Sequence, residues 1–431
     1  MSTPLEKAKN SNTFCIYPWV HQYVGPPGDV KPCCVYHQEH ELGSLKQETL
    51  KEIWNNPKTK ELRLQLLNGE KPKGCDICWR REDVVYKTHR VDANENLFKE
   101  DVYDTINSTQ EDGTVPEHKL LYIDARWNNL CNLKCRTCGP RFSTSWIEDH
   151  AALYNRTWEE VKKSGDGFQF SGQTEGQLLE EILQHIPHLK QIYFAGGEPL
   201  MQIEHYRVLE ELIKIGHTGT KEKPLVINYN TNFSQIKLGK HQALDYWKHF
   251  KNLKVNASLD GSHRRAEYWR KNTDWDTVVE NRRKMIEKCP DTEFKIAFTL
   301  SWVNAYNLPD FHREWTHLGL IKASDLSLNL LDRPYFYSIK NVPVWKKRKV
   351  EIIFNDHIEW LKQQPGNTLR IQREYADAIT FMFSVDTKDE FIGKEEFYKT
   401  TKKLDNLRQE RFWDVFPEHL DMMPLMEGLN E

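Results

Sequence analysis

The sequence has no long apolar segment, no excess of either charge and no apparent internal repeat. No stretch approaches the roughly 20 apolar residues that a membrane helix needs, and the opening residues lack the apolar core of a signal peptide. We therefore expect a soluble, cytoplasmic protein. The 60 Lys and Arg residues are balanced by 63 Asp and Glu residues, so there is no basic field to hold nucleic acid or an anionic membrane. Neither is expected as a partner.

The cysteines are few, and their distribution is uneven. There are nine, an odd number, and eight of them lie in close-spaced groups in the first third of the chain. A secreted protein stapled by disulfides is not laid out in this way, so metal ligation is the better interpretation. Aromatic residues are plentiful, with 14 Trp, 19 Phe and 17 Tyr, and they supply enough bulky apolar surface for one large or two moderate cores.

Short apolar runs alternate with amphipathic stretches from residue 119 onward. The predicted strands cover residues 119–125, 190–195, 225–230, 253–259, 293–300 and 325–331. The predicted helices between them include residues 176–188, 206–215, 242–250 and 275–288. Six β/α units in series indicate a parallel sheet, either open or curved into a partial barrel. Beyond about residue 340 the chain is charged and helical in pattern, with no visible chemical motif.

Two motifs follow the first two of these strands. The first is a C-x3-C-x2-C loop formed by Cys131, Cys135 and Cys138. Three thiolates this close can hold an iron–sulfur cluster, and the alternative is zinc with a distant fourth ligand. The second is Gly196-Gly197-Glu198-Pro199, at the end of the next strand.

In this order, the two motifs resemble the signature pair of the radical S-adenosylmethionine (SAM) enzymes. The resemblance implies that the three cysteines hold a four-iron four-sulfur cluster whose fourth iron is chelated by the amino and carboxylate groups of SAM. An electron from the cluster then cleaves SAM, and the resulting 5′-deoxyadenosyl radical takes a hydrogen atom from the substrate. Gly196 and Gly197 permit a close backbone approach, and Glu198 can accept a hydrogen bond from the SAM ammonium group.

Further residues of this sequence fall on positions that the family uses to bind SAM. Asn232, after the third strand, resembles the turn beside the ribose, and Ser258 with Arg270 resembles the pair that binds the carboxylate. The plainer alternatives are that Asn232 only caps a turn and that Arg270 only pairs with a surface acid. One departure is Thr137, which stands where the family usually has an aromatic residue near the adenine.

The N-terminal segment, residues 14–83, contains the other group of cysteines. They are Cys15, Cys33, Cys34, Cys75 and Cys78. Together with a Gly-x-x-x-Pro-Cys turn, a Leu-Gly-x-Leu segment, a Glu-Ile-Trp helix and a closing C-x2-C, they resemble the SPASM/twitch modules of the same superfamily, which bind an auxiliary cluster. Those modules usually follow the radical domain, whereas this one precedes it.

Five cysteines are one too many for a cluster with four ligands. Counted from the turn glycine, Cys33 falls on the ligand position of the family, so we expect Cys15, Cys33, Cys75 and Cys78 to bind a second four-iron four-sulfur cluster, with Cys34 beside them. A structural zinc knot made by four cysteines is the alternative. The segment is poor in apolar side chains, which favours stabilisation by a metal.

The predicted fold is α/β, a partial (β/α)6 radical SAM barrel with additions at both ends. We expect a twitch-like auxiliary-cluster module at residues 1–90, a linker at 91–118, the radical SAM barrel at 119–335 and a helical C-terminal region at 336–431. The resemblance implies an oxidoreductase or rearrangement enzyme that uses SAM and two clusters, and an electron donor such as flavodoxin or ferredoxin. The expected substrate of the enzyme is a peptide or protein, or alternatively a small metabolite. A non-catalytic iron–sulfur protein is disfavoured by the Gly-Gly-Glu-Pro strand end.

Subtracting seven cluster ligands from nine cysteines leaves Cys34 and Cys289. A radical epimerase that quenches with a thiol needs a spare cysteine facing the substrate. Cys289 precedes the fifth strand, at the barrel end away from the chemistry, and Cys34 should point away from the site that its neighbour Cys33 addresses. We therefore expect the substrate radical to be oxidised or rearranged instead.

Overall fold

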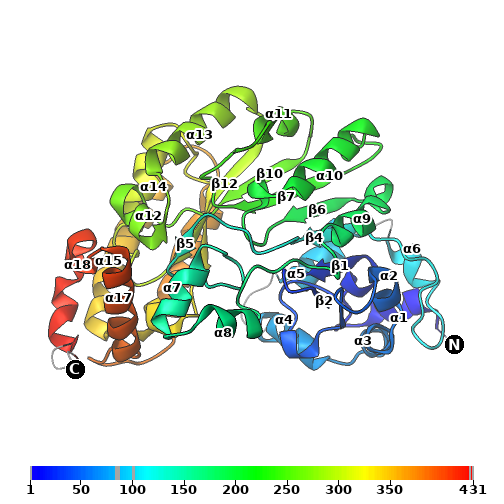
Figure 1. Ribbon diagram of the computed structural model, residues 1–431, viewed down its shortest axis with the longest axis horizontal. Coiled ribbons are helices and arrows are strands. Elements are labelled where there is room, and N and C mark those ends of the chain that lie inside the picture. Colours follow the sequence, from blue (N-terminus) through cyan, green and yellow to red (C-terminus); the bar gives the residue numbers. More distant parts are fainter. Residues whose placement is uncertain (1, 83–87, 100–101, 427–428, 430–431) are drawn as a thin grey trace. The chain divides into compact units, whose positions relative to one another are not determined.

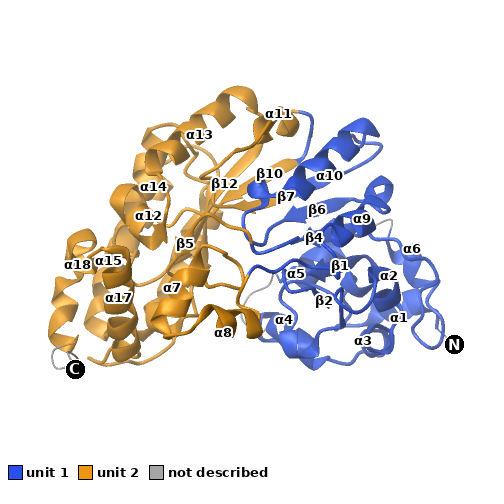
Figure 2. Ribbon diagram, in the orientation of Figure 1, with its two compact units in different colours: residues 1–129, 168–228, 249–252 blue, residues 130–167, 229–248, 253–431 orange. Residues whose placement is uncertain are grey.

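The structure is a computed structural model that describes residues 2–82, 88–99, 102–426 and 429. These residues form two compact units (Figure 2). Unit 1 comprises residues 1–129, 168–228 and 249–252, and unit 2 comprises residues 130–167, 229–248 and 253–431. Both units combine parallel strands with helices, which confirms the predicted α/β class.

All six predicted strands are present. They are β4 (Tyr122–Ala125), β6 (Gln191–Phe194), β7 (Val226–Thr231), β10 (Leu253–Ala257), β12 (Glu293–Leu300) and β13 (Leu326–Leu330). Strand β7 begins in unit 1 and ends in unit 2. The four predicted helices are also found, as α9 (Gln177–Leu183), α10 (Ile203–Lys214), α11 (Ala243–Trp247) and α13 (Trp275–Lys288).

The sheet of unit 1 includes strands from the N-terminal cysteine segment (Figure 1). Strand β1 (His21–Val24) runs parallel to β4, and β4 runs parallel to β6. Strands β2 (Asp29–Lys31) and β3 (Gly43–Ser44) extend this sheet in antiparallel pairing. The turn between β1 and β2 is closed by the Gly25 N–H, which donates to the Asp29 carbonyl at 2.9 Å. The N-terminal segment therefore uses β4 as a hydrogen-bonding partner.

The core of unit 1 includes two fully buried indole rings, those of Trp19 and Trp54. The remaining elements of unit 1 are α1 (Pro4–Asn10), η1 (Tyr17–Trp19), η2 (Gln38–His40), α2 (Leu50–Trp54), α3 (Pro57–Leu67), η3 (Lys73–Cys75), α4 (Asp76–Glu82), α5 (His89–Asp92), η4 (Ala93–Leu97), α6 (Tyr103–Ile106), η5 (Ile186–His188) and η6 (Pro199–Met201).

In unit 2, strands β10, β12 and β13 are parallel neighbours. Burial alternates along β12: Phe294, Ile296, Phe298 and Leu300 are buried, whereas the residues between them are only partly covered. A parallel sheet enclosed on both faces would bury both sets. One face of β12 is therefore buried and the other is less covered. Helices α13 and α14 (Leu308–His317) flank these strands (Figure 1).

The C-terminal region is helical, as predicted. It contains α15 (Val344–Lys362), α16 (Leu369–Met382), α17 (Lys394–Arg408), α18 (Phe412–Val415) and η9 (Pro417–Met426). Helix α16 covers strand β13, where the Glu374 carboxylate accepts a hydrogen bond from the Leu328 N–H at 2.8 Å. This contact satisfies a backbone donor on the strand.

The other elements of unit 2 are short. They are β5 (Lys134–Cys135), α7 (Trp146–Leu153), α8 (Trp158–Lys163), β8 (Lys237–Leu238), β9 (His241–Gln242), α12 (His263–Trp269), β11 (Arg270–Lys271), η7 (Tyr335–Tyr337) and η8 (Ile339–Asn341). Among the described residues, no helix is both long and apolar enough to cross a membrane.

Candidate functional site

The three-cysteine loop lies in unit 2 and is anchored by a short two-stranded ribbon. Strand β5 ends at Cys135 and pairs antiparallel with β11, so that Cys135 stands opposite Arg270. The Arg136 N–H donates to the Trp269 carbonyl at 2.9 Å and continues the pairing. Cys135 is a buried residue, and Cys131 and Cys138 are partly exposed residues. Burial raises the pKa of the Cys138 thiol to about 12, so its sulfur is sheltered like that of Cys135.

The start of α7 fixes the backbone of this loop from a second side. The Trp146 indole N–H donates to the Cys135 carbonyl at 2.8 Å, and the Ser145 hydroxyl donates to the Cys131 carbonyl at 2.8 Å. The Ser143 hydroxyl donates to the Leu133 carbonyl at 2.6 Å. These side chains satisfy loop carbonyls that no strand pairing reaches, and they hold the loop in addition to the pairing of β5 with β11.

Arg270 faces the thiol of Cys135 rather than a surface acid. Its Nε and Nη2 lie 2.8 and 2.7 Å from Oδ2 of Asp260, and its Nη1 lies 3.7 Å from the Cys135 sulfur. Asp260 is buried, and its other oxygen accepts the Thr299 N–H at 2.7 Å. Burial raises the pKa of the Cys135 thiol, and the Arg270 cation acts against that rise. Arg270 is therefore an oriented cation beside one of the predicted cluster ligands.

Asn232 lies against another of the predicted ligands. Its amide nitrogen is 3.8 Å from the Cys131 sulfur and donates to Oδ1 of Asn132 at 2.9 Å. Its own Oδ1 accepts the N–H and the hydroxyl of Ser234, at 2.9 and 2.7 Å. Asn232 therefore caps the turn after β7 and also contacts the cysteine loop. Ser258 follows β10 directly, and its N–H donates to the Thr231 carbonyl at 2.8 Å.

The Gly-Gly-Glu-Pro segment lies in unit 1, after β6. Gly196 has φ +105°, and a Cβ placed on it would be 2.9 Å from Cβ of Arg126. Only glycine fits that conformation and that contact. The Gly197 N–H donates to the Asn128 carbonyl at 3.4 Å. Glu198 is buried, and its carboxylate accepts the Leu200 N–H at 3.1 Å.

The N-terminal cysteines influence one another electrostatically. Burial raises the pKa of the Cys33 thiol, and the charges of Cys34, Cys15, Cys75 and Cys78 raise it further. Burial also raises the pKa of Cys15 to about 12 and that of Cys75, and Cys78 contributes to both shifts. The thiols that we predicted as the auxiliary ligands are therefore close enough to oppose one another's ionisation.

Cys34 has a different electrostatic environment. Burial raises its pKa to about 11, and its strongest charged neighbours are Asp124, Arg126 and Lys31 rather than the other cysteines. The charge of Cys34 nevertheless raises the pKa of the Cys33 thiol more than that of any other cysteine, so the choice of Cys33 rather than Cys34 as the ligand stays a prediction. Cys289, the other spare cysteine, follows α13 directly, and its thiol donates to the Leu244 carbonyl at 3.4 Å.

The donor sets fit iron–sulfur clusters by their chemistry. Buried thiols that raise one another's pKa stay protonated unless a positive centre compensates the thiolate charges, and a bound metal centre does so. Three thiols in unit 2 and four in unit 1 match one cluster with an open position and one with four protein ligands. Within the described residues, no three His, Cys, Asp or Glu side chains are grouped so as to hold a single metal ion.

The sequence analysis missed a buried ion pair at the end of β4. The Arg126 guanidinium donates to both oxygens of Asp124, at 2.8 and 3.0 Å, and Asp124 is fully buried. The guanidinium also lies over the ring of Tyr23, 4.7 Å from its centroid. Two charged residues at the end of an apolar strand were the available signal, because such residues are rarely buried unless paired.

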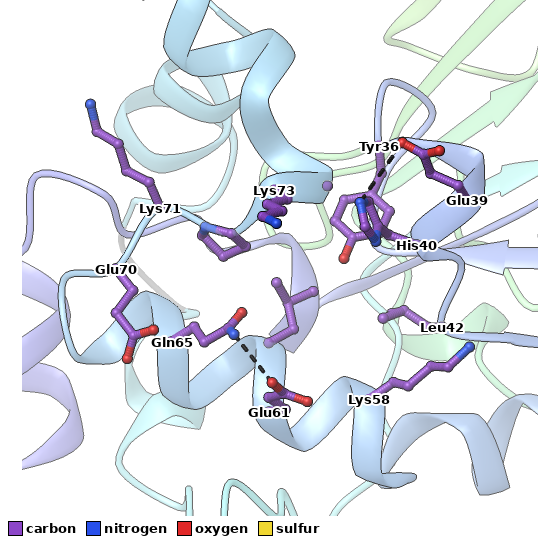
Figure 3. Close-up of a pocket in the computed structure, with 13 residues that line it drawn as sticks. Tyr36, Glu39, His40, Leu42, Lys58, Glu61, Gln65, Glu70, Lys71 and Lys73 are labelled. Atoms are coloured by element: carbon purple, nitrogen blue, oxygen red, sulfur yellow. Dashed lines mark hydrogen bonds and ion pairs between the residues drawn. The ribbon is translucent and has the colours of Figure 1, made fainter.

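A pocket of about 410 Å³ lies on the N-terminal cysteine segment (Figure 3). Its wall includes Tyr36, whose ring contacts Gly74 so closely that a Cβ there would fall 2.2 Å from Cζ of the ring. Burial raises the pKa of Tyr36, and the charges of Cys75 and Cys33 add to the rise. The pocket therefore adjoins the cysteine set. The lining of the pocket contains three lysines and three glutamates, so it favours ligands of neither charge. These residues are Lys58, Lys71, Lys73, Glu39, Glu61 and Glu70.

Comparison with known proteins identifies the N-terminal segment. Residues 15–79 match the SPASM family, described as an iron–sulfur cluster-binding domain, which confirms the predicted SPASM-type module. No curated protein sequence matches the chain.

Several solved structures align with part of the chain. A structure described as native anSMEcpe with bound AdoMet and Cp18Cys peptide is 17% identical, with a TM-score of 0.37, over 55% of this chain and 59% of that chain. The structure of Streptococcus suis SuiB bound to S-adenosylmethionine is 13% identical, with a TM-score of 0.34, over 70% of this chain and 63% of that one. The alignments span less than two thirds of either solved chain.

Proposed function

We propose that this chain is a radical SAM enzyme with an N-terminal auxiliary cluster. The observation that carries the proposal is the contact of Asn232 and Arg270 with the sulfurs of Cys131 and Cys135. SAM is chelated by the cluster in that family, so residues that bind SAM must lie beside the cluster ligands. These two residues were assigned to SAM from their sequence motifs alone, and both lie against predicted ligand sulfurs.

In the proposed enzyme, Cys131, Cys135 and Cys138 bind the catalytic cluster. That cluster supplies the electron that cleaves SAM reductively. Arg270, oriented by Asp260, provides a cation next to Cys135 and pairs with the SAM carboxylate through its outer nitrogen, with Ser258 as a second donor. Asn232 contributes a polar amide beside Cys131.

Two further sets of residues complete the proposal. Gly196 and Gly197 leave the backbone open to the methionyl group, and Glu198 accepts from its ammonium. Cys15, Cys33, Cys75 and Cys78 bind the auxiliary cluster. The SPASM match supports an iron–sulfur role for this segment. We assign the substrate to the peptide or protein class, which many relatives with auxiliary clusters use, and the outcome to oxidation or rearrangement of the substrate radical.

The decisive experiment is an assay for 5′-deoxyadenosine. Protein reconstituted anaerobically with iron and sulfide and reduced with dithionite should form it slowly from SAM even without substrate. If wild-type protein with intact clusters forms none, the radical assignment is wrong. Zinc in place of iron after purification from zinc-depleted medium would also contradict it. Mass spectrometry of a copurified molecule would then distinguish a peptide substrate from a small metabolite.

A further inference from the structure

The residues on either side of Cys135 are both connected to the C-terminal helix α17, Arg136 directly and Lys134 through Asp149 of α7. In an extended segment, alternate side chains point to opposite faces. Lys134 and Arg136, which follows β5, therefore share one face of this extended segment, and Cys135, with Arg270 at its sulfur, occupies the other. No motif assigns a role to α17, and its partners in these contacts lie more than 250 residues away along the chain.

Arg136 makes the first connection. Its guanidinium is almost completely buried and donates to Oδ1 of Asp405 at 2.5 Å and to Oε2 of Glu410 at 3.1 Å. It also stacks on the ring of Tyr268, 3.8 Å from the centroid, while the Tyr268 hydroxyl donates to the same Asp405 oxygen at 2.7 Å. The Asp405 carboxylate is thus fixed from two sides, and it fixes Arg136 in turn.

Further ion pairs tie the same ribbon to this end of the helix. Glu410, two residues beyond the last residue of α17, accepts from Lys271 of β11 at 2.9 Å. Asp149 of α7 accepts from Lys134 and from Arg408 of α17, both at 2.8 Å. The Arg408 guanidinium also lies 4.8 Å from the ring centroid of Trp146, the residue that donates to the Cys135 carbonyl.

Arg136 next to β5, Lys271 of β11 and Asp149 of α7 therefore all form ion pairs with residues at or just beyond the C-terminal end of α17. Such buried ion pairs add little to net stability, because desolvation offsets the attraction. They do fix geometry, since each removed partner leaves an unpaired buried charge.

We propose that the C-terminal end of α17 is a positioning element for the catalytic cluster, with Arg136, Asp405 and Glu410 setting the position of Cys135. This inference rests on the proposed function, because it concerns the ligand loop of that cluster. It gives the C-terminal region a role in cluster retention and SAM cleavage without contact to SAM. Groups that orient metal ligands from behind change metal affinity or activity by about 10–100-fold when they are replaced.

The test uses the full chain with both clusters reconstituted anaerobically. Asp405→Asn and Glu410→Gln each remove the negative charge of one partner of Arg136, and Arg136→Lys keeps a cation without the fork. Glu395→Gln is the control, because Glu395 pairs with Lys399 on an exposed part of the same helix. The readouts are the rate of iron release to a chelator and the change of the reduced-cluster EPR signal when SAM is added.

About half of the iron, that of the catalytic cluster, should be released from Asp405→Asn and Glu410→Gln about tenfold faster than from wild type, or faster still. The EPR response of these two variants to SAM should be weaker. Glu395→Gln should match wild type in both measurements. Arg136→Lys should be intermediate. If both carboxylate variants release iron at the control rate and keep the EPR response, the proposal is overturned. Iron release is measured without SAM, so a wild-type protein that cleaves no SAM would contradict the proposed function and leave this comparison intact.

Discussion

At the scale of single residues, the candidate site is organised by polar groups aimed at sulfur. Arg270 is held by two contacts to Asp260 and faces the Cys135 thiol. Burial lowers the pKa of the Arg270 guanidinium, and the charge of Asp260 more than reverses this. The Arg270 guanidinium therefore stays protonated across the physiological pH range, so its ability to hold an anionic group does not depend on pH.

Replacing Arg270 by Lys tests the importance of its fork. Lysine keeps the charge but cannot contact Asp260 and a SAM carboxylate in the same geometry. We expect normal iron content and a rate of 5′-deoxyadenosine formation lowered by about 10–100-fold. Arg264→Lys is the matched control, because Arg264 is exposed on the preceding helix α12. An unchanged rate in Arg270→Lys would mean that Arg270 does not bind SAM.

The adjacent cysteines of the N-terminal module allow an equally sharp comparison. Cys33 is influenced by the other cysteines, whereas Cys34 responds to Asp124, Arg126 and Lys31. We expect Cys33→Ala to lose the auxiliary cluster, which lowers iron from about eight to about four atoms per chain, and Cys34→Ala to keep it. Iron analysis with Mössbauer spectroscopy measures both. The reverse result would make Cys34 the ligand.

At the scale of secondary structure, the turn after β6 combines an unusual backbone conformation with close packing. Gly196→Ala would place a methyl group against Arg126 at positive φ, and this should lower the free energy of unfolding by about 1–3 kcal/mol. Urea titration measures the change. Gly176→Ala, also at positive φ but in open space, should cost less, and Gly167→Ala, in open space at an ordinary φ, should cost least. Equal effects in all three variants would show that the contact with Arg126 is unimportant.

The same scale shows what could be predicted from the sequence. The six strands were predictable because apolar runs and amphipathic helices alternate with a fixed rhythm, and α13 was predicted at its observed bounds. The pairing of β1 with β4 could not be predicted, because β1 is a short segment and its partner lies about 100 residues away in the sequence. The Arg136–Asp405 contact spans 269 residues. No periodicity or motif encodes such a contact, since it arises only when the chain has folded.

At the scale of the whole molecule, the two cysteine sets belong to different compact units. Unit 1 contains Cys15, Cys33, Cys75 and Cys78, and unit 2 contains the three-cysteine loop. Each set is supported by contacts within its own unit, such as β5–β11 pairing around Cys135. Each cluster should therefore assemble without the other, and removing one set of ligands should leave the other cluster intact.

Two reciprocal variants test this independence. Replacing Cys131, Cys135 and Cys138 by Ala should remove about four of about eight irons and abolish 5′-deoxyadenosine, because SAM loses its electron source. Replacing Cys75 and Cys78 should also remove about four irons, yet leave slow 5′-deoxyadenosine formation measurable, since the catalytic ligands are untouched. Circular dichroism confirms that both proteins remain folded. Loss of all the iron in either variant would show that the clusters assemble together, whereas 5′-deoxyadenosine from the triple variant would place the catalytic cluster in the N-terminal module.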